Sequence, residues 1–186
     1  MVSPEPLFID IPTIETTRLI LRKLTLVDAE DVFGYASDPD VAEMTTWEPH
    51  TSLEDSRTFL AGVRRQYRDG DGGPWGIVLK ERDHVIGTIG LSVVSWHARA
   101  ELGYAIGKQW WGRGYTTEAG QAALRFGFES LRLNRIEARC LPTNVASERV
   151  MQKLGMHAEG LLREHMYAKG RFHDFKLYSL LRREWT

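Results

Sequence analysis

The stretch QWWGRGYTTEAGQAA, residues Gln109 to Ala123, places two tryptophans, an arginine and two glycines directly before a helical pattern. The residues that precede it, RAELGYAIGK, read as a strand. From Thr116 onward, small and apolar residues recur at helical spacing, at Ala119, Ala122, Ala123, Phe126 and Gly127. The local order is therefore strand, glycine loop and helix.

The glycine loop has a composition that suits an anion. Gly112 and Gly114 allow backbone conformations that a β-carbon forbids, and they let a ligand approach the main chain closely. The first turn of the following helix presents free N–H groups and the positive end of the helix dipole. The loop is therefore predicted to bind phosphate, with Arg113 adding positive charge. A tight strand-to-helix turn without a ligand is the alternative. A P-loop does not fit, because the sequence has no Gly-x-x-x-x-Gly-Lys-Ser/Thr, and a dinucleotide motif does not fit, because Thr117 stands at its third glycine position.

Composition limits the class of protein. The chain has 186 residues and 42% hydrophobic content, which predicts one globular domain spanning residues 1–186. A net charge of −1 provides no excess positive charge for binding nucleic acid or an anionic membrane, so neither is expected as a partner. The single cysteine, Cys140, excludes an internal disulfide and a cysteine-rich metal site, and no metal is predicted. The sequence shows no signal-peptide pattern and no long apolar run, so a cytoplasmic protein is expected.

The remaining chain alternates between strand and helix patterns. Strands are expected at residues 18–24, 75–80, 85–94, 100–107 and 135–141, helices at 27–37, 52–67 and 147–155, and a hairpin at 161–181 that turns near Lys169–Gly170. Asp28 is expected to cap the first helix, and Ser52 with Asp55 the second. The three runs between residues 75 and 107 predict an antiparallel meander. The fold class is therefore α+β, a mixed sheet with helices.

The motif QWWGRG (109–114) resembles the Gln/Arg-x-x-Gly-x-Gly/Ala signature of the GNAT superfamily of acyl-CoA-dependent N-acetyltransferases. Further stretches resemble its Rim-type branch, which includes enzymes that acetylate the N-terminal residues of ribosomal proteins: TTRLILRKL, WGIVLK with VIGTIGL, AELGYAIGKQWWGRGYTTEA, NVASERVMQKLGM and REHMYAKGRFHDFKLYSLL. The resemblance covers nearly the whole chain in the family's order. It implies a GNAT fold, with a mostly antiparallel twisted sheet that is splayed between its fourth and fifth strands and flanked by helices.

The resemblance implies acetyl-CoA as the cosubstrate. Loop amides from Trp111 to Thr116 would bind its pyrophosphate, and its pantetheine arm would lie beside the strand at residues 104–106 like an added strand. The residues expected to contact the cofactor are Tyr104, Ala105, Ile106, Gln109, Trp111, Gly112, Arg113, Gly114, Tyr115, Thr116 and Asn144.

The expected reaction is direct attack of a primary amine on the acetyl thioester within a ternary complex. It requires a deprotonated amine, a stabilised oxyanion and a protonated leaving thiolate. Glu101 is the candidate base, since it alternates with Gly103 and Ala105 on the strand that leads into the glycine loop. An ordinary solvent-facing glutamate is the alternative. Glu164 is the second candidate for binding or deprotonating the amine.

The helix at 147–155 supplies the other half of the expected site. Asn144 is expected to cap this helix, which Gly155 ends, and the capping role can coexist with a CoA contact. Many superfamily members carry a tyrosine acid on this helix, but Met151 stands at that position and cannot donate a proton. Rim-type relatives resemble this sequence in offering a serine one turn earlier, here Ser147, which is the candidate acid. A hydrogen-bonded first-turn serine is the alternative.

The function predicted from the sequence is acetyl transfer from acetyl-CoA to a primary amine, with a protein N-terminal α-amino group as the first candidate acceptor. One alternative is a small-molecule acetyltransferase that acts on a polyamine or an antibiotic. The other is a non-catalytic module that binds or senses acyl-CoA. The sequence leaves the acceptor and the oligomeric state open, and a homodimer is compatible with it.

Overall fold

The computed structural model describes residues 9–185. Within them the strands are β1 (Ile14–Glu15), β2 (Leu19–Lys23), β3 (Trp75–Leu79), β4 (His84–Val94), β5 (Arg99–Ile106), β6 (Arg135–Cys140), β7 (His157–Ala168) and β8 (Arg171–Leu181). The helices are α1 (Ala29–Ala36), α2 (Pro39–Glu43), α3 (Leu53–Asp69), α4 (Tyr115–Arg125) and α5 (Val145–Lys153). Short helical turns occur at Leu26–Asp28, Ser95–His97, Lys108–Trp110, Phe126–Ser130 and Arg182–Glu184.

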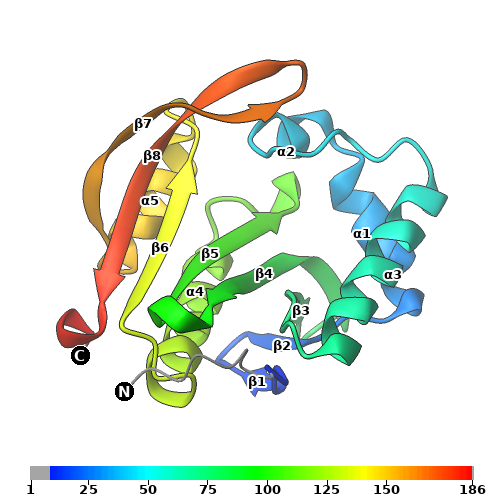
Figure 1. Ribbon diagram of the computed structural model, residues 1–186. Coiled ribbons are helices and arrows are strands. Elements are labelled where there is room, and N and C mark those ends of the chain that lie inside the picture. Colours follow the sequence, from blue (N-terminus) through cyan, green and yellow to red (C-terminus); the bar gives the residue numbers. More distant parts are fainter. Residues whose placement is uncertain (1–8, 186) are drawn as a thin grey trace.

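The strands of residues 9–185 form one sheet in the order β1-β2-β3-β4-β5-β6-β8-β7 (Figure 1). Neighbouring strands are antiparallel except for β5 and β6, which are parallel. This arrangement confirms the predicted α+β class and the mostly antiparallel sheet. The meander predicted between residues 75 and 107 is β3-β4-β5, and the hairpin predicted at 161–181 is β7-β8.

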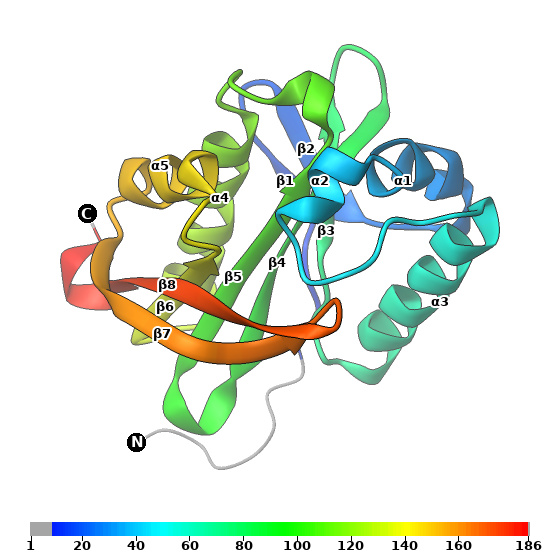
Figure 2. The same cartoon turned by 90° about the horizontal axis from the view of Figure 1, so that it is seen from above.

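Helices cover both faces of the sheet (Figure 2). Strand β3 is buried on both sides, and its neighbouring residues Ile77 and Val78 point into different clusters. Ile77 belongs to the large cluster that includes Ala119 and Ala123 of α4, while Val78 packs in the cluster that includes Leu60 of α3. Because side chains alternate along a strand, β3 supplies apolar groups to both layers.

The predicted helix caps are only partly confirmed. Ser52 and Asp55 form a capping box at the start of α3, as predicted. Asp28 does not cap α1 through its side chain. Its carboxylate instead accepts the Thr25 N–H at 2.7 Å and pairs with Arg22, whose Nη2 lies 2.8 Å from Oδ1. The cap prediction was wrong because α1 continues from the turn at Leu26–Asp28, so that the buried carboxylate is used by that turn and by the guanidinium.

The predicted splay is confirmed between β5 and β6, which are the fourth and fifth predicted strands because β1 was not predicted. Their parallel pairing begins at Arg99 with Arg135 and ends at Glu101 with Glu137. Beyond this point β5 stays paired with β4 as far as Ile106, while β6 stays paired with β8 as far as Cys140. Each strand therefore follows its outer neighbour, and the two diverge.

The β7-β8 hairpin reaches across the molecule to α2 (Figures 1 and 2). Its turn has Lys169 at φ 50° and Gly170 at φ 76°, two successive left-handed residues that are typical of a tight hairpin turn. Lys169 Nζ donates to the Ala42 carbonyl at 2.5 Å, near the negative end of α2. Helix α2 was not predicted, because it is too short to show an apolar period.

None of the helices within residues 9–185 combines the length and the apolar character needed to cross a bilayer.

The Arg22–Asp28 pair gives a stability prediction. Asp28 is 4% exposed, and the ion pair and hydrogen bonds outweigh the effect of burial, so that its pKa is lowered. Replacing Asp28 by Ala leaves the Arg22 guanidinium uncompensated and is expected to cost about 3 kcal/mol in urea unfolding. Because the pKa of Asp28 is lowered in the folded state, its carboxylate contributes fully to the free energy of unfolding above the ordinary carboxyl pKa. This contribution is lost as the pH falls below that value. The difference between wild type and Asp28→Ala should therefore shrink in acid, and a constant difference would contradict this account.

Candidate active site

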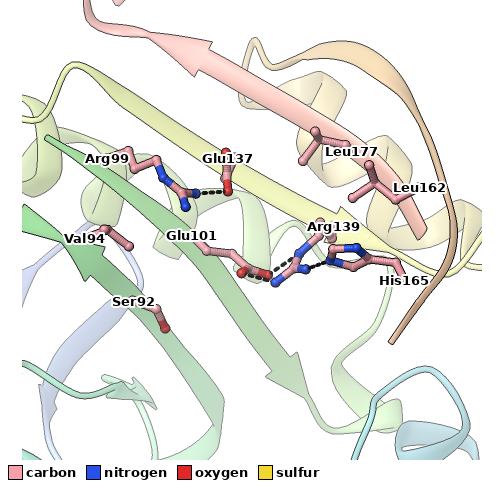
Figure 3. A pocket seen from close by; sticks show the side chains of 9 residues that line it. All are labelled: Ser92, Val94, Arg99, Glu101, Glu137, Arg139, Leu162, His165 and Leu177. Carbon is pink, nitrogen blue, oxygen red and sulfur yellow. Dashed lines mark hydrogen bonds and ion pairs between the residues drawn. The ribbon is translucent and has the colours of Figure 1, made fainter. Parts of the chain in front are cut away.

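A cavity of about 270 Å³ lies where β5 and β6 part. It is lined by Ser92 and Val94 of β4, Arg99 and Glu101 of β5, Glu137 and Arg139 of β6, and Leu162, His165 and Leu177 of the hairpin (Figure 3). Glu101 alternates with Ala100 and Leu102, which pack in the cluster beside α4, so the cavity opens on the other face of the sheet. Gly103 is the next residue of β5 on this face. A β-carbon at Gly103 would meet no atom within 4 Å, so this face of β5 is uncovered at that position.

Glu101 lies in the wall of this cavity as part of an ionic cluster. Arg139 Nε donates to its Oε1 at 2.9 Å, and Arg139 Nη2 pairs with its Oε2. The same guanidinium contacts Nε2 of His165 from β7 (Figure 3). The structure therefore places the first candidate base beside the opening, but with both carboxylate oxygens engaged by Arg139.

A second ionic cluster follows the same face of β6. Arg99 Nη1 lies 2.5 Å from Glu137 Oε1, and Arg135 Nε lies 3.0 Å from Glu137 Oε2. Arg135 also donates both terminal nitrogens to Glu159 at 2.6 Å, and Ser179 donates its hydroxyl to the same carboxylate. The hydrogen bonds from Arg135 and Ser179 lower the pKa of Glu159 to about 2. The charges on this face thus compensate one another.

Glu164, the second candidate base, lies in a β-bulge of β7 between Leu162 and Met166. Its φ of 46° is in the left-handed region, which is uncommon for a residue with a β-carbon. Asp174 of β8 stabilises the bulge, since its Oδ1 accepts the Glu164 N–H at 2.7 Å. Glu164 is exposed and does not line the cavity, so the structure does not bring it together with Glu101.

The glycine loop connects β5 to α4. Gly112 and Gly114 have φ values of 73° and 81°, where glycine is favoured. The N–H groups of residues 112–114 have no hydrogen-bond acceptor within residues 9–185. The first turn of α4, which begins at Tyr115 and Thr116, adds the free N–H groups of a helix start. The loop therefore presents successive backbone donors at the positive end of the α4 dipole.

Trp111 is not one of these donors, which corrects the expectation for its amide. Its N–H donates to the Lys108 carbonyl at 3.1 Å, and its indole Nε1 donates to the Ile106 carbonyl at 2.8 Å. Both N–H groups of Trp111 are therefore bonded to carbonyls at or next to the helical turn at Lys108–Trp110, a turn that the sequence did not predict. Gln109 lies exposed on this turn, and Arg113 lies over the Trp110 ring, 5.3 Å from its centre.

Arg18 fastens the glycine loop to the sheet. Its Nε donates to Glu118 Oε2 at 2.7 Å, and its Nη1 donates to the Arg113 carbonyl at 3.0 Å. The guanidinium also lies 4.5 Å from the centre of the Tyr115 ring. Burial raises the pKa of Glu118, but hydrogen bonds from Thr16 and Arg18 outweigh it, and the net direction is down. Sequence reasoning missed both Arg18 and Glu118, since residues this far apart in the chain give no local signal.

A second cavity, of about 370 Å³, adjoins the loop. It is lined by Thr17, Arg18, Gly114, Thr117, Glu118, Gln121 and Lys153. Within this lining Arg18 and Glu118 are paired with each other, so that Lys153 at the end of α5 supplies the excess positive charge beside the loop donors.

Asn144 and Ser147 lie at the start of α5, on the other side of the sheet from the Glu101 cavity. Asn144 Oδ1 accepts the Ser147 N–H at 3.0 Å, which confirms its predicted capping role. The Ser147 hydroxyl lies 2.8 Å from the Tyr104 hydroxyl of β5. Met151 is fully buried in the core. The resemblance implies a cofactor contact for Tyr104, but its link to Ser147 could not be read from the sequence.

Two of the missed residues, Arg139 and His165, lie in the cavity wall. The alternation of Arg135, Glu137 and Arg139 on a predicted strand is a signal that one strand face is charged. Which strand lies opposite could not be read from that pattern. His165 gives no signal of its own in the sequence, and within residues 9–185 no group of His, Cys, Asp and Glu is arranged to hold a metal ion.

Comparison with known proteins gives three consistent results. Residues 18–157 match the family model of the acetyltransferase (GNAT) domain. The uncharacterized N-acetyltransferase p20 of Bacillus licheniformis is 40% identical over 175 residues, which cover 94% of this chain and 98% of that protein. The [ribosomal protein uS5]-alanine N-acetyltransferase of Escherichia coli is 28% identical over 179 residues, covering 92% and 91% of the two chains. The crystal structure of a GNAT-family acetyltransferase from Bacillus anthracis aligns with a TM-score of 0.83 and 29% identity, covering 93% of this chain and 100% of that chain.

The segment that matches the family model begins in front of β2 and ends at the start of β7. It therefore includes the glycine loop, the divergence of β5 from β6, and the capped start of α5. The chain belongs to the GNAT family of acetyltransferases and is an acetyl-CoA-dependent N-acetyltransferase.

Proposed function

We propose that this protein acetylates a protein N-terminal α-amino group, and that the opening between β5 and β6 is where the donor and the acceptor meet. The observation that carries the proposal is the divergence of the two strands after Glu101, which connects the loop donors on one side with the Glu101 cavity on the other. The acetyl donor enters along the open edge of β5, and the amine arrives from the cavity.

The glycine loop supports the assignment of the donor's phosphate end. Three consecutive N–H groups, those of residues 112–114, are free to bind phosphate oxygens. A β-carbon at Gly112 would meet no atom within 4 Å, so there is room for a ligand against the backbone. Gly114, Tyr115 and Thr116 continue the same surface into α4, and the second cavity beside them carries Lys153 together with the Arg18–Glu118 pair.

The cavity supports the assignment of the amine. The nucleophile must lose its proton, and an α-amino group, with an ordinary pKa of about 7.7–8.0, needs less help than a lysine at about 10.4. Glu101 deprotonates it, directly or through a water, with Arg139 holding the carboxylate and His165 contacting Arg139. The Escherichia coli relative is by its name an N-acetyltransferase of an alanine in ribosomal protein uS5, and because alanine has no side-chain amine, this is consistent with an α-amino acceptor. A small amine such as a polyamine or an antibiotic is the alternative acceptor.

Gly114→Val tests the phosphate site. Valine cannot adopt a φ of 81° without strain, and its side chain would extend toward Arg18 Nη2, which lies 3.5 Å from where a β-carbon would stand. The loop must shift, and the affinity for CoA measured by calorimetry is expected to fall about tenfold or more, the equivalent of one lost charge-assisted hydrogen bond.

Gly170→Val is the matched control, because Gly170 has a similar φ of 76° but lies in the turn of the β7-β8 hairpin. It imposes the same kind of backbone strain away from the loop, so its CoA affinity should stay at the wild-type value. Equal affinities in folded Gly114→Val and Gly170→Val proteins would refute the phosphate site.

Glu101→Gln tests the base. Glutamine keeps the size of the side chain but cannot accept a proton, so kcat is expected to fall about 100-fold at neutral pH with the CoA affinity unchanged. The loss should become smaller at high pH, where more of the amine is already neutral. Glu137→Gln is the control, since Glu137 lines the same cavity and, like Glu101, has its carboxylate bound by arginine, here Arg99 and Arg135. Wild-type turnover of Glu101→Gln at every pH would move the role to Glu164 or to water.

The acceptor class is tested by measuring CoA release from acetyl-CoA with two sets of amines. The first set consists of short peptides with free N-termini, paired with the same peptides blocked at the N-terminus but carrying a lysine. The second set consists of polyamines and aminoglycosides. Turnover confined to free N-termini is expected. Turnover only in the second set would support the small-molecule alternative.

A further inference from the structure

The peptide unit between Arg113 and Gly114 in the glycine loop is held by a side chain from a distant part of the chain. Arg18, directly before β2, donates from Nη1 to the Arg113 carbonyl oxygen at 3.0 Å. Every peptide bond within residues 9–185 is trans, and in a trans unit the C=O and N–H bonds point in opposite directions. The Gly114 N–H therefore points away from the Arg18 guanidinium, and it has no acceptor in the described part of the chain.

This peptide unit would otherwise rotate easily. Gly114 has a φ of 81°, and a residue without a β-carbon accepts positive and negative φ about equally well. A half-turn of the unit would exchange the directions of the Arg113 carbonyl and the Gly114 N–H. The loop would then present a carbonyl oxygen where it now presents a donor, and an anion would be repelled. The hydrogen bond from Arg18 opposes that rotation.

Arg18 is not a free positive charge beside the loop. Its Nε donates to Glu118 Oε2 at 2.7 Å, and its guanidinium lies 4.5 Å from the centre of the Tyr115 ring. Burial raises the pKa of Glu118, but hydrogen bonds from Thr16 and Arg18 outweigh it, so this carboxylate is ionised at neutral pH. The two charges of the pair balance each other. Arg18 therefore acts on the loop through the Arg113 carbonyl rather than through net charge.

The contact between α4 and the segment before β2 does not depend on the Arg18 side chain alone. Glu118 Oε1 accepts the Thr16 hydroxyl at 2.6 Å and the backbone N–H of residue 18 at 2.8 Å, and a substitution at position 18 by any residue but proline keeps both. The Arg18 side chain is 44% exposed, so its removal leaves no buried cavity. Replacing Arg18 therefore removes the hydrogen bond to the loop while α4 stays in place.

We propose that Arg18 is a positioning residue for CoA, which fixes the Arg113–Gly114 peptide unit so that the Gly114 N–H donates to the CoA pyrophosphate. This inference rests on the proposed function, which places the pyrophosphate at the glycine loop. Arg18 itself touches neither the phosphates nor the reacting atoms. A planar guanidinium suits this role, because its fork of donors binds a carboxylate and a carbonyl together, and a lysine ammonium does not reproduce that geometry.

Arg18→Lys is the first test, because it keeps the positive charge and loses the fork. The affinity for CoA, measured by calorimetry, is expected to fall about tenfold, the equivalent of one hydrogen bond to a charged group. Arg22→Lys is the matched control. Arg22 of β2 also binds a carboxylate, that of Asp28, and a backbone carbonyl, that of Lys23, but away from the loop. The control should lower the thermal midpoint at least as much and leave the CoA affinity at the wild-type value.

A double variant separates orientation from charge. Arg18→Ala alone leaves the Glu118 carboxylate uncompensated near the loop, so it combines a charge effect with the lost hydrogen bond. Arg18→Ala together with Glu118→Gln restores the net charge of the wild-type pair. If Arg18 orients the peptide unit, the double variant still binds CoA about tenfold more weakly than the wild type. A pure charge effect predicts that its affinity recovers.

Dephospho-CoA identifies the end of the ligand that Arg18 serves. It keeps the pyrophosphate and lacks the 3′-phosphate. The Arg18 variants are expected to lose the same factor of affinity for CoA and for dephospho-CoA. A loss with CoA alone would assign Arg18 to the 3′-phosphate, in the second cavity, and would overturn the inference.

The outcomes distinguish this inference from the function on which it rests. Failure of the wild-type protein to bind CoA, or wild-type affinity in Gly114→Val, would overturn the phosphate site together with the inference. Weakened binding in Gly114→Val, combined with wild-type affinity in either Arg18→Lys or the double variant, would overturn the inference alone.

Discussion

The structure depends on the point at which β5 stops pairing with β6. Parallel pairing lasts only as far as Glu101, after which β5 is held by β4 and β6 by β8. A sheet that continued across this boundary would cover the backbone edge of residues 103–106. The divergence leaves strand edge groups unpaired, which normally invites another extended segment to add to the sheet. In the function proposed here, that segment is the acetyl donor.

The alternation of side chains along β5 divides the chemistry between two faces. Glu101 and Gly103 face the cavity, where Arg139 binds the Glu101 carboxylate and His165 contacts Arg139. Tyr104 lies on the opposite face, where it meets Ser147. Glu101 and the contact between Tyr104 and Ser147 therefore lie on opposite faces of β5, three residues apart along the strand.

The sequence predicted the elements better than the contacts between them. The order of strand, glycine loop and helix around Gly112 and Gly114 was predicted correctly. It is a local feature, because it depends on the backbone conformation of neighbouring residues. The capping of α5 by Asn144 is local in the same way. The clasp of Arg18 on Glu118 and the engagement of Glu101 by Arg139 join residues that are far apart in sequence, so no periodicity or spacing could reveal them. Short elements such as α2 were missed because they bury too few residues to show a pattern.

Hydrogen–deuterium exchange of the wild-type protein with and without CoA tests the central claim most directly. The account predicts slower exchange in two segments when CoA is present: residues 103–106 along the open edge of β5, and residues 112–116 in the loop and the first turn of α4. Strands β2 and β3, which lie away from the opening, should exchange at the same rate in both samples. Protection of the loop without any change at residues 103–106 would contradict the claim that the donor occupies the space between β5 and β6.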